Sequence, residues 1–299
     1  MQQVHATKPL LFAFDTNSHF ARIYTKLAPN NKEPAGPSAY HRGEPVFCLK
    51  PLLRLIEREI REVNELGFTN SHIVFVFDHS GTNFRHDIYP NYKANRPPKP
   101  HSWVRQLELA YEMLQAAGYT CLRVANVETD DVLATLGKVL SSHEFETILF
   151  TGDKDVMSCC NKFVSVYDGK QGKLIREPQA MERFGVPMER LLDLLALVGD
   201  TADNVPGAPG IGMVTGQKIL SHYTLDQVLA APELLREIKL RGKDGIIEVL
   251  QNNVELIKLS RSLVELKTDV GLGINLKDMV RRSPNYQQFL DGYIRPEMS

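Results

Sequence analysis

The stretch LLFAFD, residues 10–15, decides the fold because two similar stretches follow it along the chain. IVFVFD occupies residues 73–78 and TILFTGDKD occupies residues 147–155, and an aspartate follows each apolar run. Short runs that are apolar throughout are typical of strands buried on both faces, and therefore of a parallel sheet covered by helices. The sequence thus predicts an α/β fold with a mainly parallel central sheet.

Helical patterns lie between and after these runs. Residues 51–67 carry apolar side chains at helical spacing and end at Gly67, and residues 128–140 predict a helix that starts near Thr129. Residues 180–198 give another helical pattern, while a strand is expected at 119–125. We therefore predict an α/β core over 1–180, including the segment 84–106, and a helical region over 181–299.

Composition restricts the class of protein. The chain has 299 residues, 43% hydrophobic and 24% charged, which is ordinary for a folded soluble protein. The N-terminal run is short and ends in an acid, so it is a poor signal peptide, and a cytoplasmic location is expected. The cysteines show no metal-ligand spacing and are expected to be buried and reduced: Cys48, Cys121, Cys159 and Cys160.

Nine acidic side chains form the main functional prediction. The carboxyl ends of parallel strands meet at one edge of a sheet, so the aspartates after the three runs are expected to lie together. Further acids come from VETDD, residues 127–131, and from GDTAD, residues 199–203. The full set is Asp15, Asp78, Glu128, Asp130, Asp131, Asp153, Asp155, Asp200 and Asp203.

Each of these acids also has a simple structural explanation, as a turn former after a strand or as a favoured residue in a first helical turn. Three strand ends with the same feature favour a functional explanation. Converging carboxylates repel each other unless cations are present. The lack of interleaved His or Cys favours Mg²⁺, with Mn²⁺ as a substitute, over zinc. Nine acids exceed the needs of one ion, so two metal ions are expected.

A basic, aromatic segment follows Asp78. Residues 84–106, FRHDIYPNYKANRPPKPHSWVRQ, carry five Lys or Arg between Arg85 and Arg105 against one acid, with four aromatic residues interleaved. Basic and aromatic side chains together are typical of surfaces that hold single-stranded nucleic acid. A solvated basic loop is the alternative. The PPKP run makes a continuous helix unfavourable before about Ser102.

The stretch VGDTADNVPGAPGIG, residues 198–212, combines two acids with a proline- and glycine-rich turn. Gly210 and Gly212 stand just before a helical pattern, where exposed backbone N–H groups can bind an anion such as a phosphate. We expect this hairpin to hold duplex backbone without reading sequence.

Five of these stretches, in order and spacing, resemble the 5′-nuclease family, which includes flap endonucleases and the 5′→3′ exonuclease domain of DNA polymerase I. They are FAFDTNSHFAR, VFD with FRHDIYPNYKANRPPKP, VETDDVLATL, TGDKD and GDTADNVPGAPGIG. The resemblance covers about residues 10–225. It implies a PIN-like core, a helical arch or clamp over the site, and a helix–hairpin–helix at about 198–224.

The resemblance also implies roles for individual residues. The first metal would be bound by Asp15, Asp78, Glu128, Asp130 and Asp131, and the second by Asp153, Asp155, Asp200 and Asp203. Lys93 and Arg85 would act as catalytic residues at the scissile phosphate. Contacts to DNA would come from Arg22, Tyr92, Arg96, Lys99, Gly210, Gly212, Thr215 and Lys218. A K⁺ ion is expected at the hairpin.

Two departures from the family pattern stand out. Thr16 replaces the glycine that usually follows the first aspartate. Met213 and Val214 stand where a Lys-Thr pair is frequent, so the grip on duplex is weaker or depends on Lys218. Because no polymerase sequence follows, a free-standing phage or bacterial nuclease is expected.

The predicted function is structure-specific hydrolysis of 5′-flap DNA, together with 5′→3′ exonuclease activity, in replication or repair. The expected partner is DNA with a 5′ flap or 5′ end, or an RNA primer on DNA, and the protein is expected to act as a monomer. Two alternatives remain: a DNA-junction-binding protein with little catalysis, and a PIN-type nuclease acting on RNA. The presence of Asp200 and Asp203 favours catalysis over a role in binding alone. The basic segment and the hairpin favour DNA over RNA as the substrate.

Overall fold

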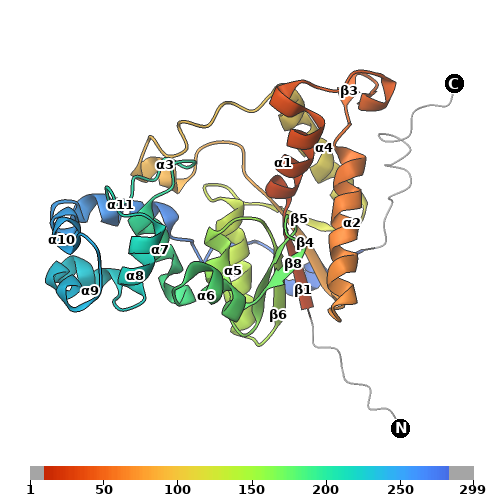
Figure 1. Cartoon of the computed structure of the whole chain (residues 1–299). Helices are drawn as coiled ribbons and strands as arrows, with labels where there is room; N and C mark the ends of the chain where they lie inside the picture. Colours follow the sequence, from red (N-terminus) through yellow and green to blue (C-terminus); the bar gives the residue numbers. More distant parts are fainter. Residues whose placement is uncertain (1–9, 283–299) are drawn as a thin grey trace, which may run out of the picture.

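A computed structural model describes residues 10–282, in which an α/β core leads into a helical region (Figure 1). Within these residues six strands form the main sheet, in the order β5-β4-β1-β6-β7-β8. The strands are β1 Leu10–Asp15, β4 His72–Phe77, β5 Thr120–Arg123, β6 Glu146–Phe150, β7 Val164–Asp168 and β8 Lys173–Ile175. All neighbours pair in parallel except β8, which is antiparallel to β7. The prediction of an α/β fold with a mainly parallel sheet is confirmed.

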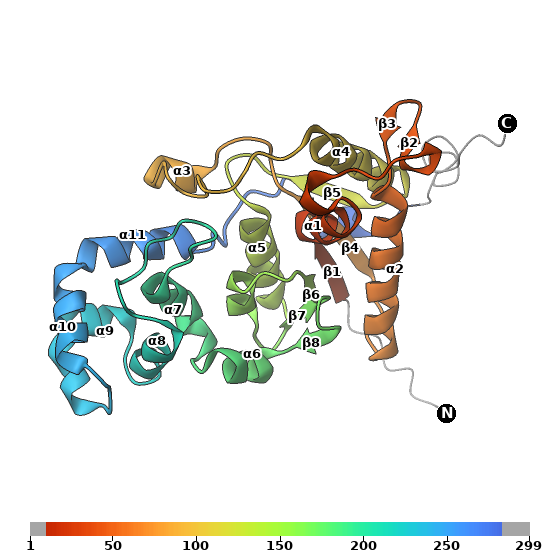
Figure 2. The ribbon, with the colours of Figure 1, turned by 45° about the horizontal axis from the view of Figure 1, so that its top comes forward.

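The sheet is buried on both faces, as the continuously apolar runs predicted. Phe12 and Phe14 of β1 point to one face, which is covered by α1 Thr16–Leu27, α2 Leu49–Glu65 and α4 His101–Ala116. Leu11 and Ala13 point to the other face, where α5 Thr129–Ser141 packs. Figure 2 shows α2 and α5 on opposite sides of the sheet. A two-stranded ribbon, β2 Tyr40–His41 and β3 Glu44–Pro45, lies before α2.

The helical region begins after β8. Its helices are α6 Glu177–Phe184, α7 Leu191–Val198, α8 Met213–Leu220, α9 Leu225–Ala230, α10 Lys243–Asn252 and α11 Val254–Val264. The helix expected over 180–198 is in fact two helices. Gly185 adopts a left-handed φ of 66° that closes α6, and Pro187 prevents the helix from resuming at once. Residues 283–299, part of the predicted region 181–299, lie outside the described residues.

Two further properties follow from the described residues. No helix among residues 10–282 combines the length and the apolar character needed to cross a membrane. The four cysteines are unpaired, and burial raises the pKa of each thiol to about 12, which keeps the thiols protonated and unreactive.

The topology places a crevice beside the end of β1. β1 lies between β4 and β6, and the chain leaves it toward α1 while α5 approaches from the other face. In open parallel sheets, ligands bind at such a point, beyond the carboxyl ends of the strands.

Candidate active site

Asp15 ends β1 and begins α1. One carboxylate oxygen accepts a hydrogen bond from the backbone N–H of Ser18 (2.8 Å), which caps the helix. The other accepts a hydrogen bond from Thr151 Oγ1 (2.9 Å), just after β6. Two neighbouring strands thus fix the orientation of Asp15.

Asp78 directly follows β4 and is held in a similar way. Its Oδ1 accepts a hydrogen bond from the backbone N–H of Thr129 at the start of α5 (2.9 Å), and its Oδ2 accepts one from Asn17 Nδ2 (2.8 Å). Asn17 and Thr151 were missed at the level of sequence. Asn17 had one available signal, its place two residues after Asp15 in a first helical turn.

A cavity of about 360 Å³ opens at this edge of the sheet. Five of the predicted acids line it: Asp15, Asp78, Glu128, Asp130 and Asp153. Three basic side chains of the segment 84–106 line it as well: Lys93, Arg96 and Lys99. The cavity therefore has an acidic floor from the core and basic groups from the segment that follows Asp78.

The acids of the cavity disfavour one another's charge. Burial, followed by the charges of Asp153, Asp15 and Glu128, raises the pKa of Asp130 well above its ordinary value. Burial, with a contribution from Asp78, raises the pKa of Asp15 to about 6. A bound cation would relieve both effects.

A second group of acids adjoins the first. Burial and the charge of Asp153, with further contributions from Asp200 and Asp203, raise the pKa of Asp155 to about 7. Asp153 thus acts on Asp130 in one group and on Asp155 in the other. The Oδ1 atom of Asp155 is buried and has no hydrogen-bond partner.

Side-chain cations of the protein itself neutralise part of this charge. Lys93 Nζ contacts Glu128 and lies 3.6 Å from Asp203 Oδ2, Arg96 contacts Asp203, and Lys154 Nζ lies 2.7 Å from Asp200 Oδ2. Burial alone would raise the pKa of Glu128, but Lys93 and Arg85 hold it below its ordinary value.

The donor set fits a hard divalent cation. The donors are carboxylate oxygens, several of them buried and mutually repelling, and Asp155 offers an oxygen without a partner. Among residues 10–282, however, no three His, Cys, Asp or Glu side chains are already arranged to hold a metal ion. Loading would therefore involve exchange of the contacts that Lys93, Arg96 and Lys154 now make.

Two predicted site residues form a buried pair with each other. Arg85 is 2% exposed and forms a paired contact with Asp131, at 2.7 and 2.8 Å, and Asp131 is fully buried. Arg85 also donates to the backbone carbonyls of Leu263 and Glu265. Neither Arg85 nor Asp131 lines the cavity. Each thus has the other as its buried partner, and the catalytic role of Arg85 and the metal-binding role of Asp131 stay predictions.

Tyr92 and Arg22 are also held inside the protein. Tyr92 is 4% exposed and donates its hydroxyl to Glu128 (3.0 Å), so its ring is not free to stack on a base. Arg22 donates to Glu59 Oε1 and to the carbonyl of Gly169, both at 2.8 Å. These internal contacts fix both side chains, and the DNA contacts expected of the two residues stay predictions.

The hairpin between α7 and α8 depends on glycine. Gly199 and Gly207 have φ of 78° and 65°, and a Cβ on Gly207 would lie 2.5 Å from the backbone N of Gly199. At the tip, Gly210 and Gly212 are exposed, and no atom lies within 4 Å of where a Cβ would be. Lys218 of α8 is exposed and Thr215 is half-buried. The backbone at the tip is therefore open to a ligand, and the predicted DNA contacts there stay predictions.

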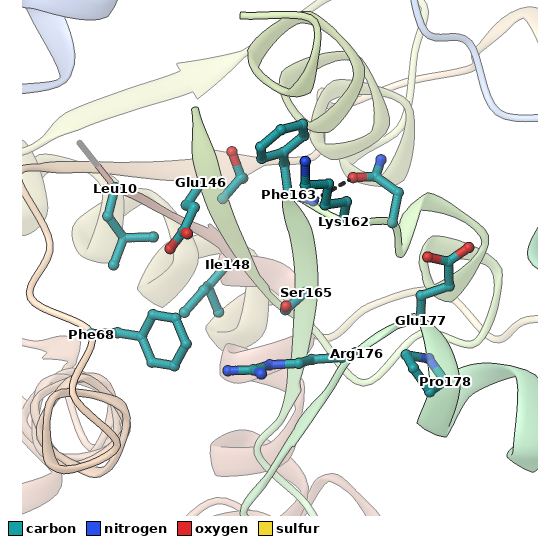
Figure 3. A pocket seen from close by; sticks show the side chains of 12 residues that line it. Leu10, Phe68, Glu146, Ile148, Lys162, Phe163, Ser165, Arg176, Glu177 and Pro178 are labelled. Atoms are coloured by element: carbon teal, nitrogen blue, oxygen red, sulfur yellow. Dashed lines mark hydrogen bonds between the residues drawn. The ribbon is translucent and has the colours of Figure 1, made fainter. Parts of the chain in front are cut away.

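A second cavity, of about 400 Å³, lies at the opposite edge of the sheet (Figure 3). It is bordered by Phe68 and Arg176, with Glu146, Lys162 and Ser165 around it. Its acids and bases balance, and the starts of β6 and β7 form its floor. It has neither the cluster of repelling acids nor a facing basic segment, so it is not a candidate for the metal site.

Comparisons with known proteins place this geometry in a family. Residues 10–185 match the model for the 5′-3′ exonuclease N-terminal resolvase-like domain, and residues 186–287 match that for the 5′-3′ exonuclease C-terminal SAM fold. The chain belongs to the 5′-3′ exonuclease family. The predicted membership of the 5′-nuclease family is confirmed. The prediction that the chain is a nuclease is confirmed with it.

Similar proteins include DNA polymerase I of Rhizobium leguminosarum, 31% identical over 92% of this chain and 26% of the relative. A 5′-3′ exonuclease of Buchnera aphidicola is 28% identical over 84% of this chain and 88% of the relative. The chain thus spans about a quarter of the polymerase relatives and most of the free-standing exonuclease.

Solved structures show the same fold. The T5 D15 protein co-crystallized with metal ions has a TM-score of 0.65 at 20% identity, over 87% of this chain and 90% of that one. The catalytic core of Rad2 in complex with DNA substrate has a TM-score of 0.57 at 14% identity, over 96% and 87%. These likenesses support the predicted PIN-like core with a C-terminal helical region.

Proposed function

We propose that this 5′-3′ exonuclease family member is a Mg²⁺-dependent nuclease of the cytoplasm. It hydrolyses DNA phosphodiesters near the junction of a 5′ flap with duplex and removes nucleotides from 5′ ends during replication or repair. One observation carries the proposal: the acid-lined cavity at the carboxyl edge of the sheet lies beneath a basic segment. Family membership supplies the reaction class.

Two divalent ions would use the two acid groups. One ion would be held by Asp15, Asp78, Glu128 and Asp130, and the other by Asp155, Asp200 and Asp203. Asp153 adjoins both groups, because its charge raises the pKa of Asp130 in one group and of Asp155 in the other. When bound, such ions lower the pKa of water and stabilise a leaving oxygen in phosphodiester cleavage.

The basic side chains would bind and orient the substrate. Lys93, with an ammonium held positive because Glu128 and Asp203 raise its pKa despite burial, lies on the wall of the cavity. A fixed cation at this place attracts the phosphodiester backbone and offsets charge that develops on the phosphate. Arg96 and Lys99 extend the positive surface beside it.

A passage for a single strand is supported by a further cavity. A space of about 190 Å³ lies on the other side of Lys93 and Arg96, and it shares Asp78 and Glu128 with the acid-lined cavity. Lys93 and Arg96 of the basic segment border both openings. We expect the 5′ strand to lie under this segment, while the hairpin at Gly210 and Gly212 contacts duplex phosphates and takes up a K⁺ ion.

The test is cleavage of a labelled 5′-flap duplex, with and without Mg²⁺, by the wild type and by Asp153→Asn. We expect Mg²⁺-dependent products near the junction and a loss of about 100-fold or more in the variant, because Asp153 acts on both acid groups. Asp87→Asn is the matched control, since Asp87 is an exposed acid of the same segment that does not line the cavity.

Each alternative has its own outcome. Tight junction binding without cleavage would replace the proposal by a binding role, and cleavage of the RNA version alone would make the protein an RNase. Equal losses in Asp153→Asn and Asp87→Asn would remove the cavity from the reaction.

A further inference from the structure

Two segments far apart in the chain, 91–96 and 201–204, are joined by hydrogen bonds that we call the clasp. The bonds to carbonyl oxygens are Lys93 N to Asp203 O (2.9 Å), Asn204 Nδ2 to Asn91 O (2.7 Å), Asn95 Nδ2 to Thr201 O (2.6 Å) and Arg96 Nε to Ala202 O (3.4 Å). The clasp connects the basic segment after β4 with the acidic loop after α7. It spans the mouth of the acid-lined cavity, because Lys93 and Arg96 belong to both.

The backbone within the clasp is strained at one residue. Lys93 has a φ of 56° and Asn204 a φ of 58°. Asparagine tolerates the left-handed region because its short side chain bonds locally, but lysine does not favour it. A residue in such a conformation persists only when its surroundings hold it there.

The surroundings of Lys93 supply that restraint from one loop. Its own N–H is held by the carbonyl of Asp203, and the carbonyl two residues before it is held by the side-chain amide of Asn204. Both bonds fix the turn from which the Lys93 side chain leaves. From this turn the ammonium reaches Glu128.

The loop side of the clasp is itself rigid. Asp200 and Val205 exchange backbone hydrogen bonds at 2.9 and 2.8 Å, and the Asp200 carboxylate accepts the N–H of Ala202 (2.8 Å). A firm loop can therefore hold the more exposed basic segment in place.

We propose that Asn204 is a positioning residue for Lys93: its amide holds the 91–93 turn so that the lysine ammonium faces the acid-lined cavity. Asn95 supports the same turn from its exposed side. The kinetic part of this inference rests on the proposed nuclease function, whereas the structural part does not.

The structural arm measures hydrogen exchange of the Lys93 backbone amide in Asn204→Gly. Glycine keeps the left-handed conformation at position 204 and removes only the side-chain amide. We expect exchange at Lys93 to speed up about tenfold, because the Lys93–Asp203 bond loses its support. Asn30→Gly is the matched control, since Asn30 also has a positive φ, 54°, on an exposed turn after α1.

The kinetic arm uses single-turnover cleavage of the 5′-flap duplex in a double-mutant cycle. Asn204→Gly should lower the rate about tenfold in the wild-type background, as expected for the loss of one well-formed hydrogen bond, and leave DNA affinity in EDTA unchanged. In the Lys93→Ala background the same change should have no further effect, because Asn204 acts through Lys93.

The outcomes separate the two proposals. Equal rate losses in both backgrounds, or unchanged exchange at Lys93, would overturn the positioning role. An inactive wild type would overturn the nuclease function, while the exchange arm would still decide on the clasp. If Asn204→Gly melts well below the wild type, Asn95→Ala tests the same clasp at an exposed residue, with the same cycle and a smaller expected loss.

Discussion

Two ion pairs involve acids at the start of α5, but one pair is buried in the core and the other borders the cavity. Asp131 forms a paired contact with Arg85, and their side chains are 0% and 2% exposed. Glu128, three residues earlier, contacts Lys93, and their side chains are 16% and 19% exposed. The first pair joins α3 Phe84–Ile88 and α5 to the end of α11, whereas the second lines the cavity.

The comparison shows that residue type and spacing do not determine whether an acid is buried in the core or borders the cavity. Both acids stand in one helical turn, and both basic partners come from the segment after Asp78. The two acids differ in their burial and in the other groups that surround them. Asp131 also accepts the backbone N–H groups of Glu128 and Lys267 and is fully buried, whereas Glu128, which accepts from Lys93 and Tyr92, borders the cavity.

The largest effect is expected for Arg85→Ala. It leaves the buried Asp131 charge without its partner and frees two carbonyls, which we expect to cost about 3–5 kcal/mol of folding free energy and lower the Tm by about 10 °C. Urea unfolding and calorimetry measure this.

The control for that variant is Arg236→Ala, which removes an exposed ion pair with Glu233 and Asp244 and should leave the Tm unchanged. A stable Arg85→Ala protein that had lost its nuclease activity would support the predicted catalytic role of Arg85.

Lys93→Ala tests the other ion pair. Removal of the cation from the cavity wall should lower the cleavage rate by about 10²–10³-fold, while the fold is kept because the pair is partly exposed. Single-turnover kinetics and a melting curve give the two readouts, with Lys50→Ala, an exposed lysine of α2, as control. Melting far below the wild type would make Lys93 structural, like Arg85.

Asp15 in the cavity and Asp155 in the adjoining acid group should make stability depend on pH. The pKa of Asp15 is raised from 3.8 to about 6 and that of Asp155 to about 7. Between pH 5 and 7 the folded chain keeps protons that the unfolded chain has released, so stability in EDTA falls as pH rises, by about 4 kcal/mol between pH 5 and 8. Urea unfolding at pH 5 and pH 8 checks this, and a rise in stability over this window would contradict it.

The smallest effect is expected for Asp130→Asn. It removes one of the repelling charges, so the cation-free protein should melt about 2–4 °C higher than the wild type. The same variant should gain less Tm from added Mg²⁺ or Mn²⁺. An unchanged gain from the metal would place Asp130 outside the metal site.

The sequence allowed a good prediction of the sheet and of the acids at its edge. Asp15, Asp78 and Asp153 follow directly from apolar runs that fit buried parallel strands, and the geometry of a parallel sheet brings such ends together. The break at Gly185 and Pro187 was visible in the sequence as well, but the helical pattern on both sides outweighed it.

The burial of Arg85 and Asp131 could not be predicted from the sequence, because it depends on contacts between distant parts of the chain. Arg85 is buried by carbonyls of Leu263 and Glu265, about 180 residues away. Tyr92 likewise is covered only once its segment folds back on α5. No local pattern encodes such contacts.

Asp153 links the two acid groups thermodynamically. Its charge opposes ionisation of Asp130 on one side and of Asp155 on the other. A cation that neutralises Asp153 from one side also weakens the attraction felt by a cation on the other. Because such coupling is reciprocal, we expect the two ions of the proposed mechanism to bind with negative cooperativity, and a calorimetric titration to show a second event weaker than the first.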